Sequence, residues 1–356
     1  MKNQTVIHSQ GAASHNPGAT MTESVFAASP PDDRANAKIR RETITAMAVF
    51  GLTALLIVLS RFVSPALGGW DLVHTVLILA SFLIVVSFGQ GLVILIGGLD
   101  LSIPALITFS GVLTASWIGV SGDGSWYLFP LIMAACAAVG AINGVGIVFL
   151  DIPPFIMTMA TGIIVASSAL GFTHGSPRGG SPPVLLSLMK GSFVGIPWIV
   201  LFIMLFCIIA VLVQSRTTLG RRLMAIGSNV RAAVLTGIST YTYTILAYAV
   251  SSMSAGFAGM MLVGYANGAT LRMGDGYLLS TIAAVVVGGS SILGGRGSYV
   301  STIGGALLLT TLGIVISALG VPQGWRTVIE GSTILFALFL LREHVFFSFS
   351  RPNSKH

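Results

Sequence analysis

Charged side chains are scarce in this sequence: Asp, Glu, Lys and Arg together make up 8% of its 356 residues. A soluble domain carries about 25% charged residues, so this chain lacks the means to cover a water-facing surface of its size. Hydrophobic residues make up 54% of the chain instead. This composition excludes an ordinary soluble protein and indicates a membrane protein, because a lipid-facing surface is apolar.

Cysteine is rare as well, and the pattern of an ATP-binding loop is missing. Cys136 and Cys207 each lie in an apolar run, which excludes a disulfide framework and offers no metal-binding spacing. The chain contains no Gly-Lys dipeptide, and therefore no G-x-x-x-x-G-K-[ST] loop to hold nucleotide phosphates. No cofactor is therefore expected on this chain, and any ATP and Mg²⁺ would bind to a partner polypeptide.

Long apolar stretches predict an all-α polytopic membrane protein with about ten transmembrane helices. A spanning helix needs about 20 predominantly apolar residues. The expected spans are Thr43 to Val63, Leu72 to Ile96, Pro104 to Val120, Tyr127 to Leu150, Phe155 to Phe172, Ile196 to Val213, Tyr243 to Tyr265, Leu278 to Leu293, Tyr299 to Leu319 and Arg326 to Leu341.

The distribution of positive charge predicts the orientation and the domain limits. An even number of spans places both termini on one side, and with both inside, 13 of the 18 Lys and Arg residues fall on cytoplasmic segments. The net charge of +7 is therefore read as a topology signal and not as nucleic-acid binding. We expect a disordered cytoplasmic tail over 1–37, a transmembrane domain over 38–345 with its largest cytoplasmic loop at 214–241, and a cytoplasmic tail over 346–356.

Glycine-rich interruptions mark one span in each half of the chain. The second span runs into a segment with Gly97, Gly98, Asp100 and Ser102, and the eighth runs into a second such segment. The residues of interest in that second segment are Gly288, Gly289, Ser290, Gly294 and Gly295. Paired interrupted spans point to two inverted halves with a substrate path between them, whereas the alternative is close helix packing and tight turns.

No expected span holds a carboxylate well inside it, since Asp100, Asp123, Asp151 and Asp275 fall at span edges or in loops. This scarcity argues against a carrier driven by protons or cations, which needs intramembrane ionisable groups. It favours a neutral, hydroxyl-rich solute guided by uncharged polar side chains. The candidates besides Ser102 are Gln90, Thr108, Ser110, Asn143, Thr158 and Thr161, each of which could instead form a helix–helix hydrogen bond.

The loop 214–241 predicts two short helices. The first runs from Thr218 to Gly227, and the second covers Val230 to Leu235, begins after Ser228 or Asn229 and is closed by Gly237. We expect a bend at Gly227, because glycine accepts positive φ. Such a pair suits a rigid lever, and the alternative is a solvated loop whose arginines only set topology. The residues assigned to this lever are Leu219, Gly220, Arg221, Arg222, Gly227, Asn229, Arg231, Ala232, Ala233 and Gly237.

Three ordered motifs resemble the ribose-type permeases of ABC sugar importers. They are Gly-Gly-Leu-Asp-Leu-Ser at 97–102, Leu-Gly-Arg-Arg-Leu-Met-Ala-Ile-Gly-Ser-Asn at 219–229 with the Ala232-Ala233 pair after it, and the segment from Ile282 to Gly297. The resemblance runs from about Thr43 to Leu341. Ile103-Pro104 departs from the family pattern, and proline suits the first turn of a helix, so the third span is expected to begin there.

The resemblance implies a multi-pass subunit of a bacterial inner membrane that is not itself an ATPase. It implies three partners: a separate ABC ATPase docked on the loop 214–241, a periplasmic solute-binding protein, and a second permease subunit, the same or different. Other solutes of the same superfamily, such as branched-chain amino acids, urea or nucleosides, are the nearest alternative. A secondary transporter that works without ATP is a further alternative from another class, and a membrane-embedded enzyme is the most distant one.

Overall fold

A computed structural model describes residues 31–63, 69–119 and 125–322, together with parts of 324–335. Its contacts divide the chain into a unit of residues 1–41 and a unit of residues 42–356. The fold described below is that of the second unit, apart from the first turns of its first helix.

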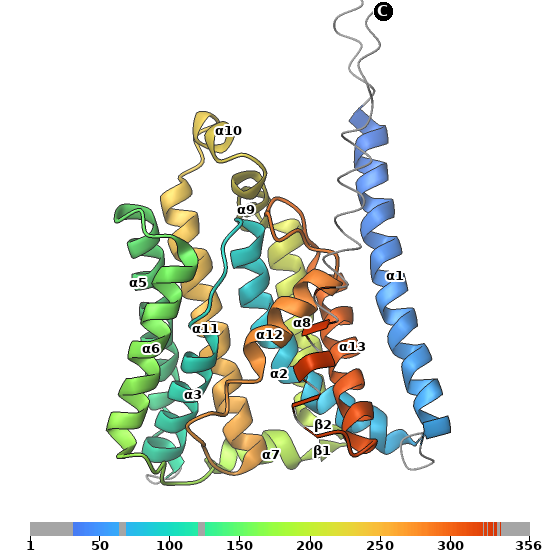
Figure 1. The fold of residues 1–356 in the computed structure, drawn as a ribbon, viewed down its shortest axis with the longest axis vertical. Coiled ribbons are helices and arrows are strands. Elements are labelled where there is room, and N and C mark those ends of the chain that lie inside the picture. The colour runs from blue at the N-terminus through green and yellow to red at the C-terminus, as the bar shows by residue number, and fades with distance from the viewer. Residues whose placement is uncertain are drawn as a thin grey trace, which may run out of the picture. The chain divides into compact units, whose positions relative to one another are not determined.

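The described chain is built almost wholly from helices (Figure 1). The long ones are α1 (Pro31–Val63), α2 (Trp70–Leu95), α5 (Leu128–Phe149), α6 (Pro154–Thr173), α8 (Trp198–Arg216), α11 (Thr240–Ala266) and α13 (Tyr299–Ala318). The shorter ones are α3 (Ile103–Leu113), which continues into a π-helical turn at Thr114–Ile118, α7 (Pro183–Lys190), α9 (Thr218–Ser228), α10 (Val230–Leu235) and α12 (Tyr277–Val287). A two-residue antiparallel hairpin, β1 (Ser192–Phe193) and β2 (Ile196–Pro197), precedes α8.

These helices confirm the prediction of an all-α polytopic membrane protein. Seven of the described helices are long and apolar enough to cross a membrane, and two shorter apolar helices, Ile103–Ile118 and Tyr277–Val287, accompany them. Together they match the first nine expected spans, with α3 beginning at Ile103 as the proline indicated. The expected tenth span and the tail 346–356 lie largely or wholly outside the described residues.

Two boundaries differ from expectation. The eighth span was expected to reach Leu293, but α12 ends at Val287 because Gly288 and Gly289 (φ +82°) turn the chain there. At the other end, α1 begins at Pro31, so residues 31–37 of the expected tail are helical. Residues 1–30 of that tail lie outside the described residues.

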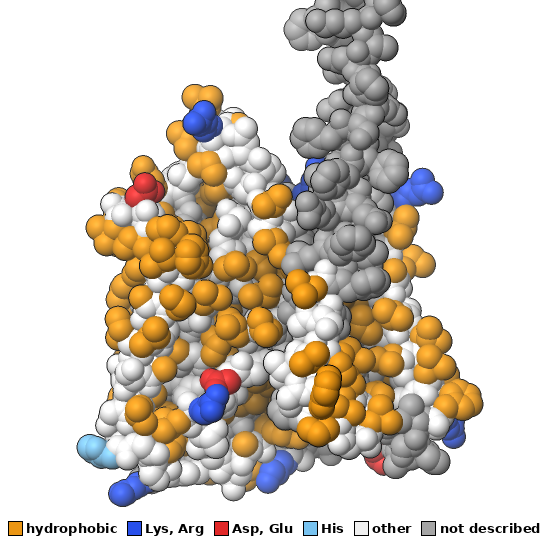
Figure 2. Space-filling model, viewed as in Figure 1, with side chains coloured by type: hydrophobic (Ala, Val, Ile, Leu, Met, Phe, Trp, Pro, Cys, Tyr) orange, Lys and Arg blue, Asp and Glu red, His pale blue; other side chains and the backbone are white. Residues whose placement is uncertain are grey.

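The outer surface has the character that the composition predicted. Large apolar side chains are exposed along α6 and α8, including Ile163 and Ile164 at 62% and 65% exposure and Ile208 at 57%. Figure 2 shows hydrophobic side chains over the flanks of the helices, with most Lys and Arg side chains near the upper and lower ends of the view. Lipid accepts such flanks, so the exposed apolar area needs no protein partner to explain it.

The core forms around α11, which packs against α2, α3 and α5. Small residues permit the close approach of these helices. A Cβ on Gly140 of α5 would overlap the Tyr248 carbonyl oxygen of α11, and a Cβ on Gly259 of α11 would overlap the Ile107 carbonyl oxygen of α3. A Cβ on Gly89 of α2 would lie 2.5 Å from the Ser251 Cα of α11. The Gly89-Gln90-Gly91 run is therefore a packing surface within an unbroken helix.

We expect Gly140→Ala to destabilise the folded protein, because its methyl group would meet the backbone of α11. Overpacking of this kind costs about 1–3 kcal/mol. Gly313→Ala is the matched control, since nothing lies within 4 Å of a Cβ at that position of α13. Thermal unfolding of the purified protein in detergent measures the stability of both variants. An equal loss of stability in the two would contradict this account of the core.

Candidate functional site

Two long membrane helices are each followed by an irregular segment that leads into a short helix (Figure 1). The long helix α2 ends at Leu95, and an irregular segment, 96–102, leads to the short helix α3. The long helix α11 ends at Ala266, and an irregular segment, 267–276, leads to the short helix α12. With 11 residues and a rise of about 1.5 Å each, α12 covers only about half of a bilayer's hydrocarbon core.

This pairing corrects one part of the sequence prediction. The segment at 97–102 was expected to correspond to the glycine-rich segment at 288–297, but its structural counterpart is 267–276. The 288–297 segment follows α12 and returns to the end of α2, where the Gly295 amide donates a hydrogen bond to the Leu95 carbonyl at 2.8 Å. Gly294 and Gly295 of this segment therefore allow a close junction with the end of α2.

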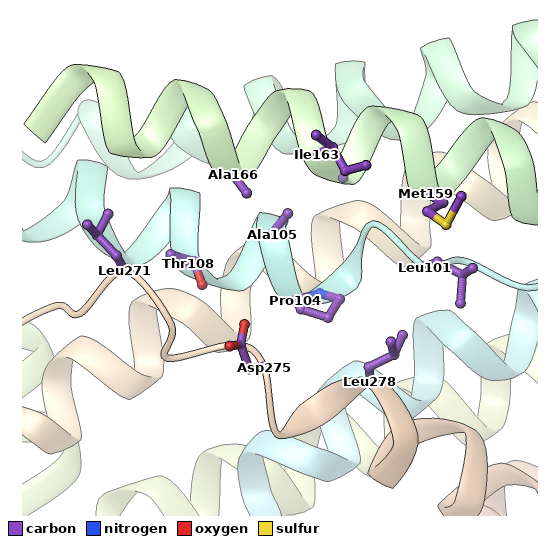
Figure 3. A pocket seen from close by; sticks show the side chains of 11 residues that line it. Leu101, Pro104, Ala105, Thr108, Met159, Ile163, Ala166, Leu271, Asp275 and Leu278 are labelled. Carbon is purple, nitrogen blue, oxygen red and sulfur yellow. The ribbon is translucent and has the colours of Figure 1, made fainter. Parts of the chain in front are cut away.

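The two irregular segments meet at one open groove of about 310 Å³ (Figure 3). Leu101 contributes from the first irregular segment and Pro104 from the start of α3, which follows it. Leu271 and Asp275 contribute from the second irregular segment and Leu278 from the start of α12. One face of α6 forms the opposite wall, with residues spaced three and four apart as on a single helix face. The lining residues of α6 and α3 are Met159, Gly162, Ile163, Ala166, Ala105 and Thr108.

The first interruption is fastened to three helices by side-chain hydrogen bonds. Asp100 is fully buried, and its Oδ1 accepts bonds from the Ser102 amide at 3.0 Å and the Ser102 hydroxyl at 2.5 Å. Its Oδ2 accepts a bond from the Ser251 hydroxyl of α11 at 2.8 Å. Asn143 of α5 donates to the Ser102 hydroxyl at 3.2 Å. The amide of Leu101 donates to the Thr158 hydroxyl of α6 at 3.0 Å.

The second interruption rests on the first turns of α3. The Gly274 amide donates to the Thr108 hydroxyl at 3.2 Å, and a Cβ on Gly274 would overlap the Pro104 carbonyl oxygen. Arg272 and Asp275 form an ion pair at 2.7 Å, with side chains 87% and 50% exposed. Figure 3 shows the Asp275 carboxylate beside the groove, across from α6.

The predicted pathway residues therefore fall into separate places. Asp100, Ser102 and Asn143 are joined but fully buried, and they support the groove from behind without lining it. Of the other hydroxyl candidates, Thr108 lines the groove, whereas Ser110 donates across to the Gly256 carbonyl at 2.7 Å and Thr161 donates within its own helix.

The remaining predicted residues lie along α2 and after α12. Gln90 is fully buried, and neither of its side-chain polar atoms has a hydrogen-bond partner. Gly97 and Gly98 lie at the first interruption, where a Cβ on Gly98 would overlap the Tyr248 hydroxyl. Gly288 packs on the backbone of α13, Gly289 faces Thr45 of α1, and Ser290 is 3% exposed. None of these lines the groove.

The loop 214–241 holds the two predicted helices, and the second has the predicted bounds. The first continues to Ser228, and the chain turns at Asn229 (φ −163°, ψ 105°), whose side chain accepts a hydrogen bond from the Ala232 amide at 3.0 Å. Gly227 was expected to supply the bend, but it lies inside α9 and is not among the residues with positive φ. Gly237 (φ +80°) ends the second helix as predicted.

Gly227 is instead the point where α9 touches both interrupted spans. A Cβ at this position would overlap the Leu95 carbonyl oxygen and the Gly295 amide nitrogen. Ser228 lies against Gly295 as well, with its hydroxyl 3.5 Å from the Gly295 carbonyl. The ends of α2 and α9 and the segment after α12 therefore meet within backbone contact, and we call Leu95, Gly227 and Gly295 the three-way junction.

The other lever residues divide into anchored and exposed ones. Gly220 is buried, because α9 approaches the Gln214 carbonyl at the end of α8, and Leu219 packs on the core beside it. Arg222 donates to the Tyr243 hydroxyl and lies over that ring, 5.2 Å from its centroid. Ala233 is 3% exposed and packs within this chain. Arg221, Arg231 and Ala232 remain exposed.

Sequence reasoning missed the groove itself. The 267–276 segment reads as an ordinary outer loop, with Gly268, Gly274 and Gly276 as turn residues. A signal was present in the shortness of the apolar run after it, because α12 alone is too short to span a bilayer. The sequence gives no sign that the α6 residues line a groove, because they are as apolar as lipid-facing residues.

The comparisons with known proteins agree on one family. A family model described as "Branched-chain amino acid transport system / permease component" matches residues 72–338. The chain is 30% identical over 299 residues to a probable ABC transporter permease protein, y4mJ, of Sinorhizobium fredii, covering 84% of this chain and 89% of that protein.

Two further relatives are named as sugar permeases. The chain is 34% identical over 260 residues to the ribose import permease protein RbsC of Bacillus subtilis, covering 72% of this chain and 80% of that protein. It is 28% identical over 323 residues to the galactose/methyl galactoside import permease protein MglC of Escherichia coli, covering 85% of this chain and 96% of that protein. No solved structure matches the chain.

Proposed function

The chain belongs to the family of branched-chain amino acid transport system permease components, and from this premise we propose that it carries a monosaccharide or a similar polyol-like solute. In this proposal it is the membrane-spanning subunit of an ABC importer in a bacterial inner membrane, with both termini in the cytoplasm. The single observation that carries the proposal is the groove at which both interrupted spans meet. Irregular backbone at membrane depth has to be buried or line a water-filled path, and substrate sites of transporters lie at such interruptions.

The lining of the groove suits a sugar. The Thr108 hydroxyl and the Asp275 carboxylate offer hydrogen-bond acceptors to sugar hydroxyl groups, and Arg272 beside them offers donors. Apolar side chains such as Leu271 and Met159 can cover the C–H faces of a sugar ring. A volume of about 310 Å³ lies at the lower end of the range of small-molecule sites, about 300–1,000 Å³.

An amino-acid substrate is the nearest alternative, because the family model's own description names one. A zwitterion would need a free cation for its carboxylate and a free anion for its ammonium group. In the ion pair at 2.7 Å the charges of Arg272 and Asp275 compensate each other, while their remaining N–H groups and oxygen lone pairs stay available to neutral hydroxyl groups. The pairing favours an uncharged solute, in keeping with relatives named for ribose and for galactose.

We propose that α9 and α10 form the docking surface for a separate ABC ATPase, on which ATP and Mg²⁺ bind. Val230, Val234 and Leu235 are 53%, 54% and 88% exposed at the tip of α10, and the exposed Arg231 lies beside them. An apolar tip with a basic rim suits insertion into a groove on a partner. A periplasmic solute-binding protein and a second permease subunit, the same or different, would complete the importer.

The groove proposal predicts opposite outcomes for two adjacent isoleucines. Ile163 lines the groove and Ile164 does not, although both are similarly exposed. We expect Ile163→Trp to fill the groove and lower the rate of sugar uptake by roughly tenfold or more, whereas Ile164→Trp leaves uptake near wild type. The measurement is uptake of labelled ribose, galactose and leucine into vesicles that hold the complete importer.

Equal uptake by the two variants would show that the solute passes elsewhere. Membrane insertion and the amount of assembled complex are checked for both variants, so that loss of uptake cannot be mistaken for loss of the protein. Transport of leucine and of neither sugar by the wild type would overturn the proposed substrate class while leaving the groove in place.

The three-way junction predicts a coupling defect for Gly227→Ala. Alanine is allowed in a helix, so the damage comes only from the overlap of its methyl group with Leu95 and Gly295. Substitutions along a coupling route typically change coupling by about 0.5–2 kcal/mol, and we expect uptake to fall about tenfold. ATP hydrolysis should lose its stimulation by the loaded solute-binding protein. Gly171→Ala, where nothing lies within 4 Å of a Cβ, is the matched control.

Two results separate the lever from a passive loop. If Gly227→Ala couples ATP hydrolysis to uptake as the wild type does, the junction does not transmit motion. If instead Gly227→Ala and Gly171→Ala are equally impaired, the defect belongs to glycine substitution in general and not to the junction.

A further inference from the structure

A group of buried polar side chains surrounds Asp100 and takes no part in the groove. Asp100, Ser102, Asn143, Tyr248, Ser251 and Ser252 are all 0% exposed, and we call them the Asp100 cluster. They come from the first interruption, from α5 and from α11, so the cluster lies where these three parts of the chain meet. The groove lining contains none of them.

Hydrogen bonds join four members of this cluster, and contacts with Gly98 and Gly140 place Tyr248 and Ser252 beside them. Asp100 is hydrogen-bonded to Ser102 and Ser251, and Asn143 to Ser102. The Tyr248 hydroxyl lies against Gly98, two residues before Asp100, because a Cβ on Gly98 would overlap it. A Cβ on Gly140, one turn before Asn143 on α5, would lie 2.5 Å from the Ser252 hydroxyl oxygen.

The charge of Asp100 has no protein counterpart among the described residues. Its three hydrogen bonds come from two hydroxyl groups and one amide, all uncharged donors. The one ion pair found in the described part of the chain, Arg272 with Asp275, lies elsewhere. An ionised carboxylate enclosed in protein costs several kcal/mol unless something neutralises it, so either a proton or a bound cation is required.

Buried polar atoms without a hydrogen-bond partner favour the bound cation. Asn143 Oδ1, Tyr248 Oη and Ser252 Oγ are buried and have no hydrogen-bond partner, and on α2 the same holds for Ser87 Oγ and for both polar atoms of Gln90. Buried polar atoms are normally satisfied, so each of these calls for an explanation. A proton on Asp100 would need one acceptor and would leave most of them unpartnered. A hard cation binds several oxygen ligands at once.

We propose that the Asp100 cluster binds one monovalent alkali cation, which neutralises the carboxylate and supplies a partner to the unpartnered oxygens of Asn143, Tyr248 and Ser252. One carboxylate among otherwise neutral oxygens matches a single positive charge, whereas a divalent ion would leave the site with a net charge. The ion would tie the first interruption to α5 and α11. Being enclosed, it acts as a structural ion, and the proposal does not depend on which solute is carried.

The test is the thermal unfolding midpoint of the full-length chain, purified in detergent, in sodium, potassium or choline chloride at equal ionic strength and pH. A ligand that binds only the folded state raises this midpoint with its concentration. We expect a rise in sodium or potassium chloride relative to choline chloride. The rise should be lost in Asp100→Asn and kept in Asp275→Asn, which makes the same chemical change outside the cluster.

A second variant keeps the proposal testable if Asp100→Asn fails to fold. Tyr248→Phe removes one proposed ligand oxygen and keeps the ring, so the alkali concentration needed for half of the rise should increase several-fold. Equal midpoints in all three salts for the wild type would overturn the proposal and leave a protonated carboxyl group with ordered water. A full rise in Asp100→Asn would also overturn it, by placing the ion elsewhere.

Discussion

Backbone that leaves the helical path inside a membrane must find hydrogen-bond partners within the protein or in water, because lipid provides none. This chain contains two such irregular segments, and neighbouring helices hold both of them through hydrogen bonds and close packing. The segment 96–102 is held by Thr158 of α6, by Ser251 of α11 and, through Ser102, by Asn143 of α5. The segment 267–276 is held by Thr108 and by close packing on Pro104.

The two irregular segments are held by different numbers of contacts, so the two sides of the groove differ in rigidity. The segment 96–102 lies behind the groove, where a buried carboxylate and several hydroxyl groups hold it to three helices. The second presents an exposed ion pair and lies on the surface of α3. A solute in the groove would therefore touch one rigid wall and one wall with fewer attachments. Segments with few buried contacts are those that open most easily.

The three-way junction connects this arrangement to the cytoplasmic lever. Gly227 of α9 contacts the end of α2, which leads into the first interruption, and Gly295, which follows α12 and hence the second. A displacement of α9 would act on both spans at once through backbone contacts, without any intermediate side chain to absorb it. Arg222 adds a third attachment, since it clamps α9 to Tyr243 near the start of α11.

Local sequence patterns predicted the elements well and their tertiary partners poorly. Apolar length marked the nine matching spans, Pro104 marked the start of α3, and Asn229 and Gly237 marked the limits of α10, because each of these signals acts within a few residues. Gly227 was misread, since glycine serves both bends and close approach, and only the neighbouring chain decides which. Asp100 looked like a residue at the edge of a span, and its burial depends on Ser251, which is 151 positions away.

The central claim is that the groove between the interrupted spans is an aqueous path and not a lipid-filled crevice. A cysteine at Ala166, which lines the groove, tests it directly in a background where Cys136 and Cys207 are replaced by serine. The measurement is the rate of reaction with a small, charged thiol reagent in membrane vesicles, compared with a cysteine at Ile164 outside the groove. The account predicts rapid reaction at 166, slowed by a transported sugar, and little at 164. An unreactive cysteine at 166 would contradict it.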